Sequence, residues 1–407
     1  MKLKDSKIIV IGGGGIGCGV AYSLCKAGYN DLLLIEKNSD LAAETTSQGA
    51  GLVGQLRDDI DRVSLAKWSV DVFDHLQAKA KIKPEWNQVG SLRVALTEEK
   101  ASEFEELRKI AINAGVNTEW ISSEKAKELW PYFDFSSTNG VLWCGTDGYL
   151  SPSKLAKSYS DETKKIGGEI ATGTWVEDII SSNGKVTGVK TNLGTISCDI
   201  LINAAGAHAW HIANMAGLDL PIFPIRHEYL VSSDIESINP NLPTMRIPEA
   251  SLYLRAKNNG LLLGGWEQNS ISIDPKEFTN KERPPKIKED IEVMRWFKKQ
   301  IMPIKNDINK LEIKDIYKGW PTFVPDGKFI VGPTKILKGF IMAAGCNAHG
   351  ISGSAGIGKH VLESITQKTF TPYLSSLSPD RFIDKEWKRS DAIKDSQDVY
   401  ELSLIHI

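Results

Sequence analysis

The chain has 407 residues, 41% of them hydrophobic, and a formal net charge of -2. A chain of this length exceeds one ordinary core, so we expect two domains, or one large domain with a second inserted into it. Positive and negative residues are mixed along the chain, and no apolar run approaches the length that spans a membrane. These features argue against nucleic acid and membrane as partners and favour a small molecule.

The cysteines stand apart in the sequence, at Cys18, Cys25, Cys144, Cys198 and Cys346, and no two form a C-x-x-C pair. Such spacing is typical of reduced thiols. The apolar run behind the first charged residues is too short for the core of a signal peptide. We therefore expect a cytoplasmic protein.

The stretch KIIVIGGGGIGCGVAYSLCKAGYNDLLLIEK predicts a strand, a glycine turn, a helix and a second strand. Gly12, Gly14 and Gly17 have the G-x-G-x-x-G spacing, which allows a tight turn, access of a pyrophosphate to the helix N-terminus, and close packing of helix on strand. Glu36, at the end of the second strand, is placed to bind an adenosine ribose. A purely structural glycine turn is the alternative, and this motif alone does not distinguish NAD from FAD.

Two further stretches favour the longer cofactor. The loop ETTSQGAGLVGQL, residues 44–56, is small and polar where NAD domains usually continue into another strand and helix, and small residues let a backbone approach a flat ring. Near the other end, GFIMAAGCNAHGISGSAGIGK predicts a strand, a glycine-rich turn and a helix from about Ser354. Two nucleotide-facing turns suit one long cofactor.

In these motifs the sequence resembles the FAD-dependent amine oxidoreductases of the D-amino-acid oxidase group, most closely their dimethylglycine and sarcosine dehydrogenase branch. The resemblance runs from Lys7 to about Glu401, and further stretches that carry it, in the family's order, are GTDGYLSPSKLAKSY, LINAAGAHA, IRHEYLV, LPTMRIPEASLYLR, LLLGGWE and PTFVPDGKFIVG. It implies a mixed α/β (α+β) fold, with a Rossmann-like FAD-binding domain and an inserted antiparallel-sheet substrate domain. The residues that it implies for contact with FAD are Gly12, Gly14, Gly15, Ile16, Gly17, Glu36, Lys37, Thr45, Thr46, Ser47, Gln48, Gly51, Leu52, Val176, Ala205, Gly206, Gly345, Asn347, His349, Gly350 and Ile351.

The two domains are expected to be discontinuous in the sequence. The FAD-binding domain is predicted over residues 1–89, 145–220 and 319–375, and the substrate domain over residues 90–144 and 221–318. Asn183 and Gly184 give a two-residue hairpin signal inside a predicted β-meander of the first domain. The seam between the domains is the natural place for a substrate.

The end of the chain is treated separately. Residues 376–401 are expected to form a linker or tail. The last six residues, 402–407 (LSLIHI), match one reading frame of a transposon-end adapter used in preparing DNA libraries, and we interpret them as a sequencing-adapter artefact. A genuine hydrophobic terminus is the alternative.

The resemblance also bears on how the flavin is held. Relatives often carry, in the loop that passes the flavin ring, a histidine joined covalently to the flavin, and here Gln48 takes that place. Sarcosine oxidases use a cysteine at a position that aligns with Gly319. Neither residue can form the bond, so we expect non-covalent FAD. An exposed loop amide away from the ring is the alternative for Gln48.

The resemblance implies oxidation of a small N-methylated amino acid, such as dimethylglycine or sarcosine, by hydride transfer to flavin, giving an imine that yields formaldehyde. The substrate amine must lose its proton, and burial and a fixed cation both favour this. The candidate residues, which flank the flavin loop or share faces of the predicted strands, are His227, Tyr229, Tyr253, Trp266, Arg57 and Arg255. Core positions for the aromatic residues and a surface position for Arg255 are the alternatives. His208 and His211 lack a third ligand, so we expect no metal site.

Three expectations about partners remain. Sarcosine oxidases carry an oxygen-activating lysine where Leu262 aligns, so we expect a dehydrogenase that passes electrons to a carrier protein. Folate becomes a partner only if the natural chain continues into a folate-binding domain. Two other functions stay open: oxidation of another amine or amino acid such as glycine, and a non-catalytic, flavoprotein-like regulatory subunit.

Overall fold

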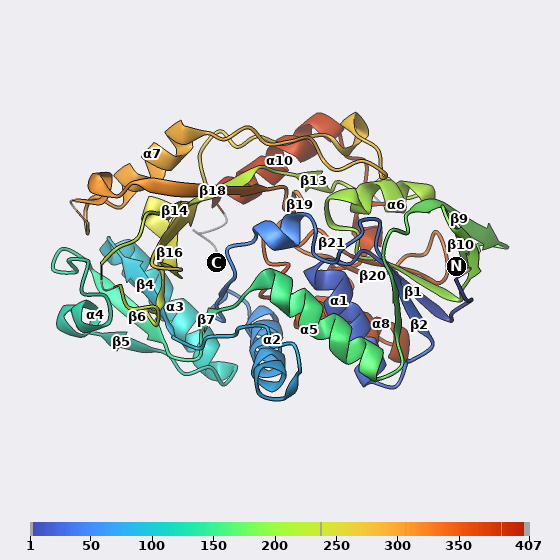
Figure 1. Cartoon of the computed structure of the whole chain (residues 1–407), viewed down its shortest axis with the longest axis horizontal. Coiled ribbons are helices and arrows are strands. Elements are labelled where there is room, and N and C mark those ends of the chain that lie inside the picture. Colours follow the sequence, from blue (N-terminus) through green and yellow to red (C-terminus); the bar gives the residue numbers. More distant parts are fainter. Residues whose placement is uncertain (1–2, 237, 306, 384, 403–407) are drawn as a thin grey trace.

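The computed structural model describes residues 3–236, 238–305, 307–383 and 385–402. It is built around two large sheets, which lie toward opposite ends of the long axis in Figure 1. One sheet carries the glycine turn, and the other carries His227, Tyr229 and Tyr253. This arrangement confirms the predicted mixed α/β fold.

The first sheet has six strands in the order β20-β21-β12-β1-β2-β8. Their bounds are β1 (Ile8–Ile11), β2 (Leu32–Ile35), β8 (Glu169–Ala171), β12 (Ile200–Asn203), β20 (Ile330–Pro333) and β21 (Phe340–Ala344). All pairs are parallel except β20 with β21. β1 and β2 are uninterrupted apolar runs because both faces of this sheet are covered.

Different layers cover the two faces of the first sheet. One face packs against three helices, α1 (Gly15–Lys26), α5 (Pro152–Lys165) and α8 (Ser354–Thr366). The other packs against α6 (Ala209–Met215) and a meander of β9 (Val176–Ser182), β10 (Lys185–Thr191) and β11 (Gly194–Ser197). Asn183 and Gly184 form the predicted hairpin turn, with φ of 51° and 70°. α1 and α8 lie side by side (Figure 1), so the glycine-rich turns before them open at the same edge of the sheet.

The second sheet has eight strands in the order β18-β14-β17-β16-β15-β4-β6-β5. Their bounds are β4 (Ser91–Ala95), β5 (Glu119–Ile121), β6 (Gly140–Cys144), β14 (His227–Ser232), β15 (Thr244–Ile247), β16 (Leu252–Lys257), β17 (Gly260–Gly265) and β18 (Ile313–Gly319). Its pairs are antiparallel apart from β4 with β15. That parallel pair joins the two excursions of the chain into one sheet. The domain boundaries themselves stay a prediction.

Helices and short strands complete the second unit and its junction with the first. α4 (Ser123–Leu129) and α7 (Ile291–Gln300) cover one face of the eight-stranded sheet, and α3 (Glu98–Asn113) and α2 (Ile60–Lys79) pack on the other. Two short antiparallel pairs join loops near the junction: β3 (Leu52–Val53) with β7 (Gly148–Tyr149), and β13 (Phe223–Pro224) with β19 (Thr322–Phe323). Among the described residues, no helix combines the length and apolar character that crossing a bilayer requires.

The C-terminal segment is folded where we expected a linker or tail. After α9 (Pro372–Ser376), residues Arg389–Leu402 form α10, which packs against β19 and lies between α7 and β13 in Figure 1. Tyr400 near its end is fully buried. Leu402 ends this helix, and residues 403–407 of the expected artefact lie outside the described residues.

Candidate functional site

The turn between β1 and α1 leaves backbone open to a ligand. Gly12 has a φ of +112°, and a Cβ there would lie 2.4 Å from the carbonyl oxygen of Ala204. α1 begins after Gly14 without a side-chain cap and without an acidic residue in its first turn, so its N-terminal N–H groups keep their partial positive charge. The Gly15 amide donates to the hydroxyl of Thr46 over 3.0 Å. An open helix N-terminus beside small residues fits a pyrophosphate.

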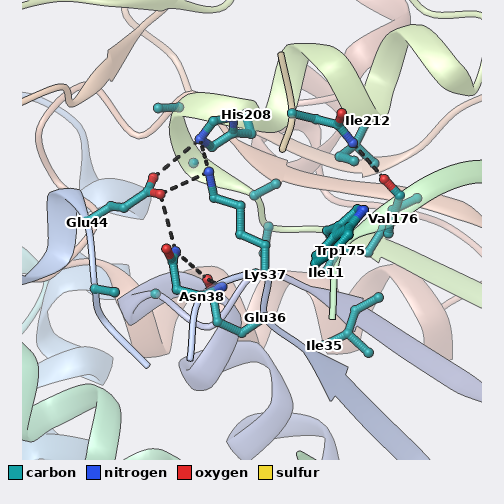
Figure 2. Close-up of a pocket in the computed structure, with 18 of the residues that line it drawn as sticks. Ile11, Ile35, Glu36, Lys37, Asn38, Glu44, Trp175, Val176, His208 and Ile212 are labelled. Carbon is teal, nitrogen blue, oxygen red and sulfur yellow. Dashed lines mark hydrogen bonds and ion pairs between the residues drawn. The ribbon is translucent and has the colours of Figure 1, made fainter. Parts of the chain in front are cut away.

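A first cavity, which we call the nucleotide cavity, lies at the carboxyl ends of β1, β2 and β12 (Figure 2). The predicted cofactor residues that line it are Gly12, Gly14, Glu36, Lys37, Thr45, Thr46, Val176, Ala205 and Gly206. The Glu36 carboxylate accepts hydrogen bonds from the amides of Gly13 (2.6 Å) and Asn38 (2.8 Å). An acid at the end of β2 therefore holds the glycine turn, next to the apolar side chain of Val176.

A polar triad at the rim of this cavity was not predicted from the sequence. Lys37 Nζ lies 2.9 Å from Glu44 and 2.7 Å from Nε2 of His208 (Figure 2). Burial opposes ionisation of Glu44, but His208 and Lys37 outweigh it and lower its pKa to about 2. Burial lowers the pKa of His208, and the neighbouring Glu44 opposes that effect. Within the described residues, no group of His, Cys, Asp and Glu side chains gathers as the ligands of a metal ion would.

A second cavity, which we call the aromatic cavity, adjoins the first, since both are lined by Gly14, Thr45, Thr46 and Gly206. Both cavities are open to solvent, and their empty space, open solvent included, is about 710 and 1230 Å³. Other predicted residues that line the aromatic cavity are Gly15, Ile16, Gln48, Gly51, Leu52, His227, Tyr253, Trp266, His349, Gly350 and Ile351. One elongated ligand can therefore extend from the nucleotide cavity to the substrate-side aromatic residues.

Gln48 and Gly319 meet at the wall of the aromatic cavity. A Cβ built on Gly319 would lie 2.4 Å from Oε1 of Gln48 and 3.2 Å from its Cβ. Both residues line the cavity, and the Gln48 side chain is only partly exposed. Gln48 and Gly319 are thus neighbours, and the carboxamide occupies the space where a side chain at position 319 would lie.

His227, Tyr253 and Trp266 form a polar aromatic group in the wall of the aromatic cavity. Nε2 of His227 lies 2.7 Å from the Tyr253 hydroxyl, and the ring centroids of His227 and Trp266 are 5.2 Å apart. Burial lowers the pKa of His227 to about 4 and raises that of Tyr253 well above its usual value. Both side chains are therefore neutral at pH 7. The indole N–H of Trp266 is buried and has no acceptor among the described residues.

The two predicted carboxylate clamps lie behind the cavity wall. Arg57 is buried, donates to the carbonyl oxygen of Leu56 (2.6 Å) and does not line the aromatic cavity. Arg255 donates to the carbonyl oxygen of Ala50 over 2.8 Å and stacks on Tyr149, so it fastens the flavin-ring loop to β16. We had expected both guanidinium groups to face the substrate, and the structure places neither there.

Arg246 lines the aromatic cavity instead and was missed from the sequence. It lies opposite Tyr253 in the antiparallel pair β15–β16, and opposite residues share a face of the sheet. Its guanidinium makes no hydrogen bond or ion pair with any described residue. The signal in the sequence was the arginine in LPTMRIPEASLYLR, but only the strand register shows which face it occupies.

Five other predicted residues do not line either cavity. Gly17 packs α1 on the glycine turn, where a Cβ would lie 1.8 Å from the carbonyl oxygen of Gly12. Ser47 is exposed, whereas Gly345 and Asn347 form the turn after β21, in which the Asn347 carboxamide accepts from the amide of Val324. The fifth, Tyr229, is buried against Tyr317 behind Tyr253, with ring centroids 5.0 Å apart.

Comparison with known proteins decides the family. A model of the family described as "DAO: FAD dependent oxidoreductase" matches residues 7–364. The chain belongs to this family. The recognised resemblance is therefore confirmed, and so is FAD as the cofactor of this fold.

Relatives and solved structures agree with that assignment. The chain is 30% identical to 4-methylaminobutanoate oxidase (formaldehyde-forming) of Paenarthrobacter nicotinovorans, over 89% of this chain and 44% of the relative. It is 28% identical to mitochondrial dimethylglycine dehydrogenase of Homo sapiens (93% and 45%) and 27% identical to the mitochondrial regulatory subunit of pyruvate dehydrogenase phosphatase of Mus musculus (88% and 41%). The chain thus spans less than half the length of these relatives. The structure of L-proline dehydrogenase from P. horikoshii superposes with a TM-score of 0.83, at 26% identity, covering 95% of this chain and all of that one.

Proposed function

We propose that this FAD-dependent oxidoreductase oxidises a small N-methylated amino acid of the dimethylglycine or sarcosine type. The observation that carries the proposal is the juxtaposition of a neutral His227–Tyr253 pair with the guanidinium of Arg246 in one cavity that adjoins the nucleotide cavity. When bound, FAD accepts a hydride from the carbon next to the substrate nitrogen. The resulting imine reacts with water to give formaldehyde and the demethylated amine.

The residues of the nucleotide cavity fit FAD. The open N-terminus of α1 beside Gly14 would hold the pyrophosphate, Glu36 the ribose, and Val176 the adenine. Gln48 and Gly319 would lie beside the flavin ring, and neither side chain can form a covalent bond to it. We therefore propose that the FAD is dissociable.

The substrate side of the aromatic cavity supplies binding and orientation. Arg246 would pair with the substrate carboxylate, and its positive charge, together with the aromatic walls, favours the neutral form of the amine. We propose that the buried hydroxyl of Tyr253, in the wall of the same cavity, faces the substrate nitrogen. A small molecule that carries both a carboxylate and an amine would fit a cavity that offers the Arg246 cation and the uncharged His227–Tyr253 pair.

The surroundings of Leu262 on the second sheet support a proposal for the electron acceptor. Leu262 is fully buried in an apolar cluster where sarcosine oxidases are expected to carry their oxygen-activating lysine. We propose a dehydrogenase that passes electrons to a carrier protein, and folate as a partner only of a longer chain.

The free and mostly buried cysteines support the expectation of a cytoplasmic protein.

Similarity to L-proline dehydrogenase supports a second candidate, oxidation of another secondary amine that bears a carboxylate. The regulatory subunit among the relatives supports the non-catalytic alternative. Formaldehyde formed per flavin reduced, measured in a single anaerobic turnover, separates these functions. Stoichiometric formaldehyde supports an N-methyl substrate, flavin reduction without formaldehyde supports another amine, and no reduction by any amine supports the regulatory function.

A further inference from the structure

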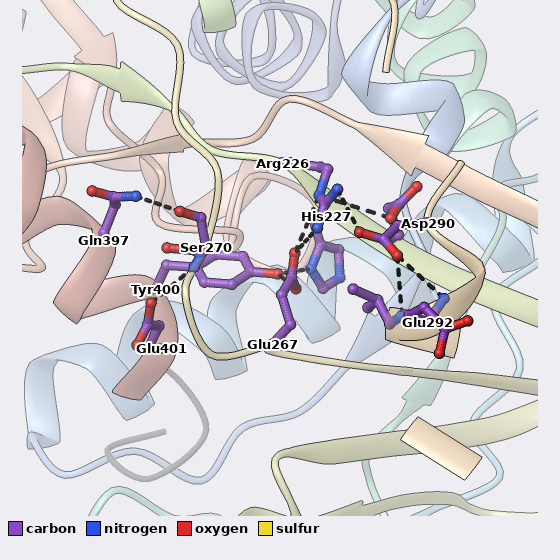
Figure 3. A network of polar contacts seen from close by, with 11 residues as sticks. Arg226, His227, Glu267, Ser270, Asp290, Glu292, Gln397, Tyr400 and Glu401 are labelled. Atoms are coloured by element: carbon purple, nitrogen blue, oxygen red, sulfur yellow. Dashed lines mark hydrogen bonds and ion pairs between the residues drawn. The ribbon is translucent and has the colours of Figure 1, made fainter. Parts of the chain in front are cut away.

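Tyr400 reaches the substrate side from the C-terminal helix. It lies near the end of α10, is fully buried, and places its hydroxyl 3.1 Å from Nδ1 of His227 (Figure 3). The same hydroxyl donates to the carboxylate of Glu267. Tyr400 does not line the aromatic cavity, so it acts on His227 from behind.

The contacts of Glu267 decide the direction of these hydrogen bonds. Burial raises the pKa of Glu267, and the Tyr400 hydroxyl and the guanidinium of Arg226, which lies 3.3 Å from the carboxylate, oppose that rise and favour the ionised acid. An ionised carboxylate only accepts hydrogen bonds, so the hydroxyl hydrogen of Tyr400 points to Glu267. The lone pairs of the Tyr400 oxygen then face Nδ1 of His227.

This arrangement selects one tautomer of His227. A nitrogen that faces the oxygen lone pairs of Tyr400 must carry a hydrogen to form a hydrogen bond, so Nδ1 is protonated. His227 is neutral, and its Nε2 is therefore an acceptor. The hydroxyl of Tyr253, 2.7 Å away, donates to Nε2 and presents its oxygen lone pairs to the cavity.

We propose that Tyr400, with Glu267 behind it, is a positioning residue that fixes the tautomer of His227 and thereby holds the Tyr253 hydroxyl hydrogen away from the substrate nitrogen. The inference rests on the proposed function. An amine gives up a hydride only while its nitrogen lone pair is free. In the opposite tautomer, Nε2 of His227 would donate to Tyr253, and the hydroxyl hydrogen would turn to the amine and occupy that lone pair.

The end of α10 is fastened at the segment that carries Glu267. The carboxamide of Gln397 donates to the carbonyl oxygen of Ser270, and the amide of Ser270 donates to Glu401 over 2.9 Å (Figure 3). These bonds lie on both sides of Tyr400 in the sequence. The segment expected to be a linker or tail therefore completes the substrate side of the site.

The direct test is the tautomer itself, read from the side-chain ¹⁵N shifts of FAD-loaded protein, with the His227 signal assigned through H227N. We expect protonated Nδ1 in the wild type and loss of that preference in Y400F and in E267Q. Protonated Nε2 in the wild type would overturn the proposal. This readout needs no turnover, so it stands even if no amine reduces the flavin and the proposed function fails, and the wild-type tautomer tests the proposal even if Y400F or E267Q does not fold.

The kinetic test uses the limiting rate of flavin reduction at saturating substrate. Y400F removes one hydrogen bond that favours the His227 tautomer with Nδ1 protonated. The limiting rate should therefore be about tenfold lower in Y400F, with the substrate Kd unchanged within about twofold. S396A is the matched control, because that hydroxyl is buried on the same helix and has no partner among the described residues. A Y400F rate equal to that of the wild type would contradict the proposal.

Discussion

The buried carboxyl group of Glu228 makes the stability of the protein depend on pH. Glu228 lies on β14 and is fully buried, and its nearest cation, Arg226, is 3.8 Å away. Arg226 also pairs with Glu267 and Asp290, so its charge is shared among three acids. Burial, opposed by Arg226 and reinforced by Glu267 and Asp290, raises the pKa of Glu228 from 4.5 to about 7.

The direction and size of the effect follow from this rise. The folded protein binds a proton at Glu228 more tightly than the unfolded chain, so this group's contribution is fully present below about pH 4.5 and is lost as the pH rises through about 7. A difference of 2.5 between the two pKa values corresponds to about 3 kcal/mol of unfolding free energy, as an order of magnitude. E228Q removes the ionisation and should avoid that loss.

The assay is thermal unfolding of FAD-loaded wild type and E228Q at about pH 5 and about pH 8.5. For a chain of this length, about 3 kcal/mol corresponds to a shift in Tm of roughly 3 to 4 °C if unfolding is cooperative. We expect E228Q to exceed the wild type by about this amount at the higher pH and by much less at the lower pH. D315N is the matched control, because Asp315 is exposed on the neighbouring strand β18. A Tm difference between E228Q and wild type that is the same at both pH values would refute the reasoning.

Three further predictions concern the site. R246Q should raise the Kd of dimethylglycine about tenfold or more, because it removes the charged partner of the substrate carboxylate. R283Q, at an exposed position, should leave this Kd unchanged. Flavin difference spectra measure both Kd values, and equal affinities of R246Q and wild type would exclude Arg246 as the anchor. Y253F should lower the limiting rate of flavin reduction about 100-fold in stopped-flow traces, with Y22F as a buried control, and a wild-type rate in Y253F would remove Tyr253 from the chemistry. Acid precipitation should release all the flavin into the supernatant, and a fluorescent protein band on a denaturing gel would disprove non-covalent binding beside Gln48.

Features set by neighbouring residues in the sequence could be predicted. The glycine turn, Glu36 and the hairpin at Asn183 each depend on a few consecutive residues with defined backbone needs, and the structure contains all three. The small residues of the loop 44–56 let its backbone line the aromatic cavity, and Gln48 lies at the wall of that cavity. Its place beside a flavin ring stays a prediction.

Features set by strand register or by helix docking could not be predicted. Arg57, Arg246 and Arg255 all lie on or near the predicted elements, but only the pairing of β15 with β16 and the course of the chain after β3 decide which guanidinium enters the cavity. Tyr400 belongs to a polar helix with few apolar residues. Nothing in its local sequence indicates that its ring is buried against His227.

Anaerobic titration of the FAD-loaded protein with dimethylglycine and then sarcosine, followed at the visible absorbance maximum of the flavin, tests the central claim most directly. The proposed function predicts bleaching by at least one of the two compounds, to completion at one equivalent of electron pairs per flavin. A bound, yellow flavin that neither compound bleaches would contradict it.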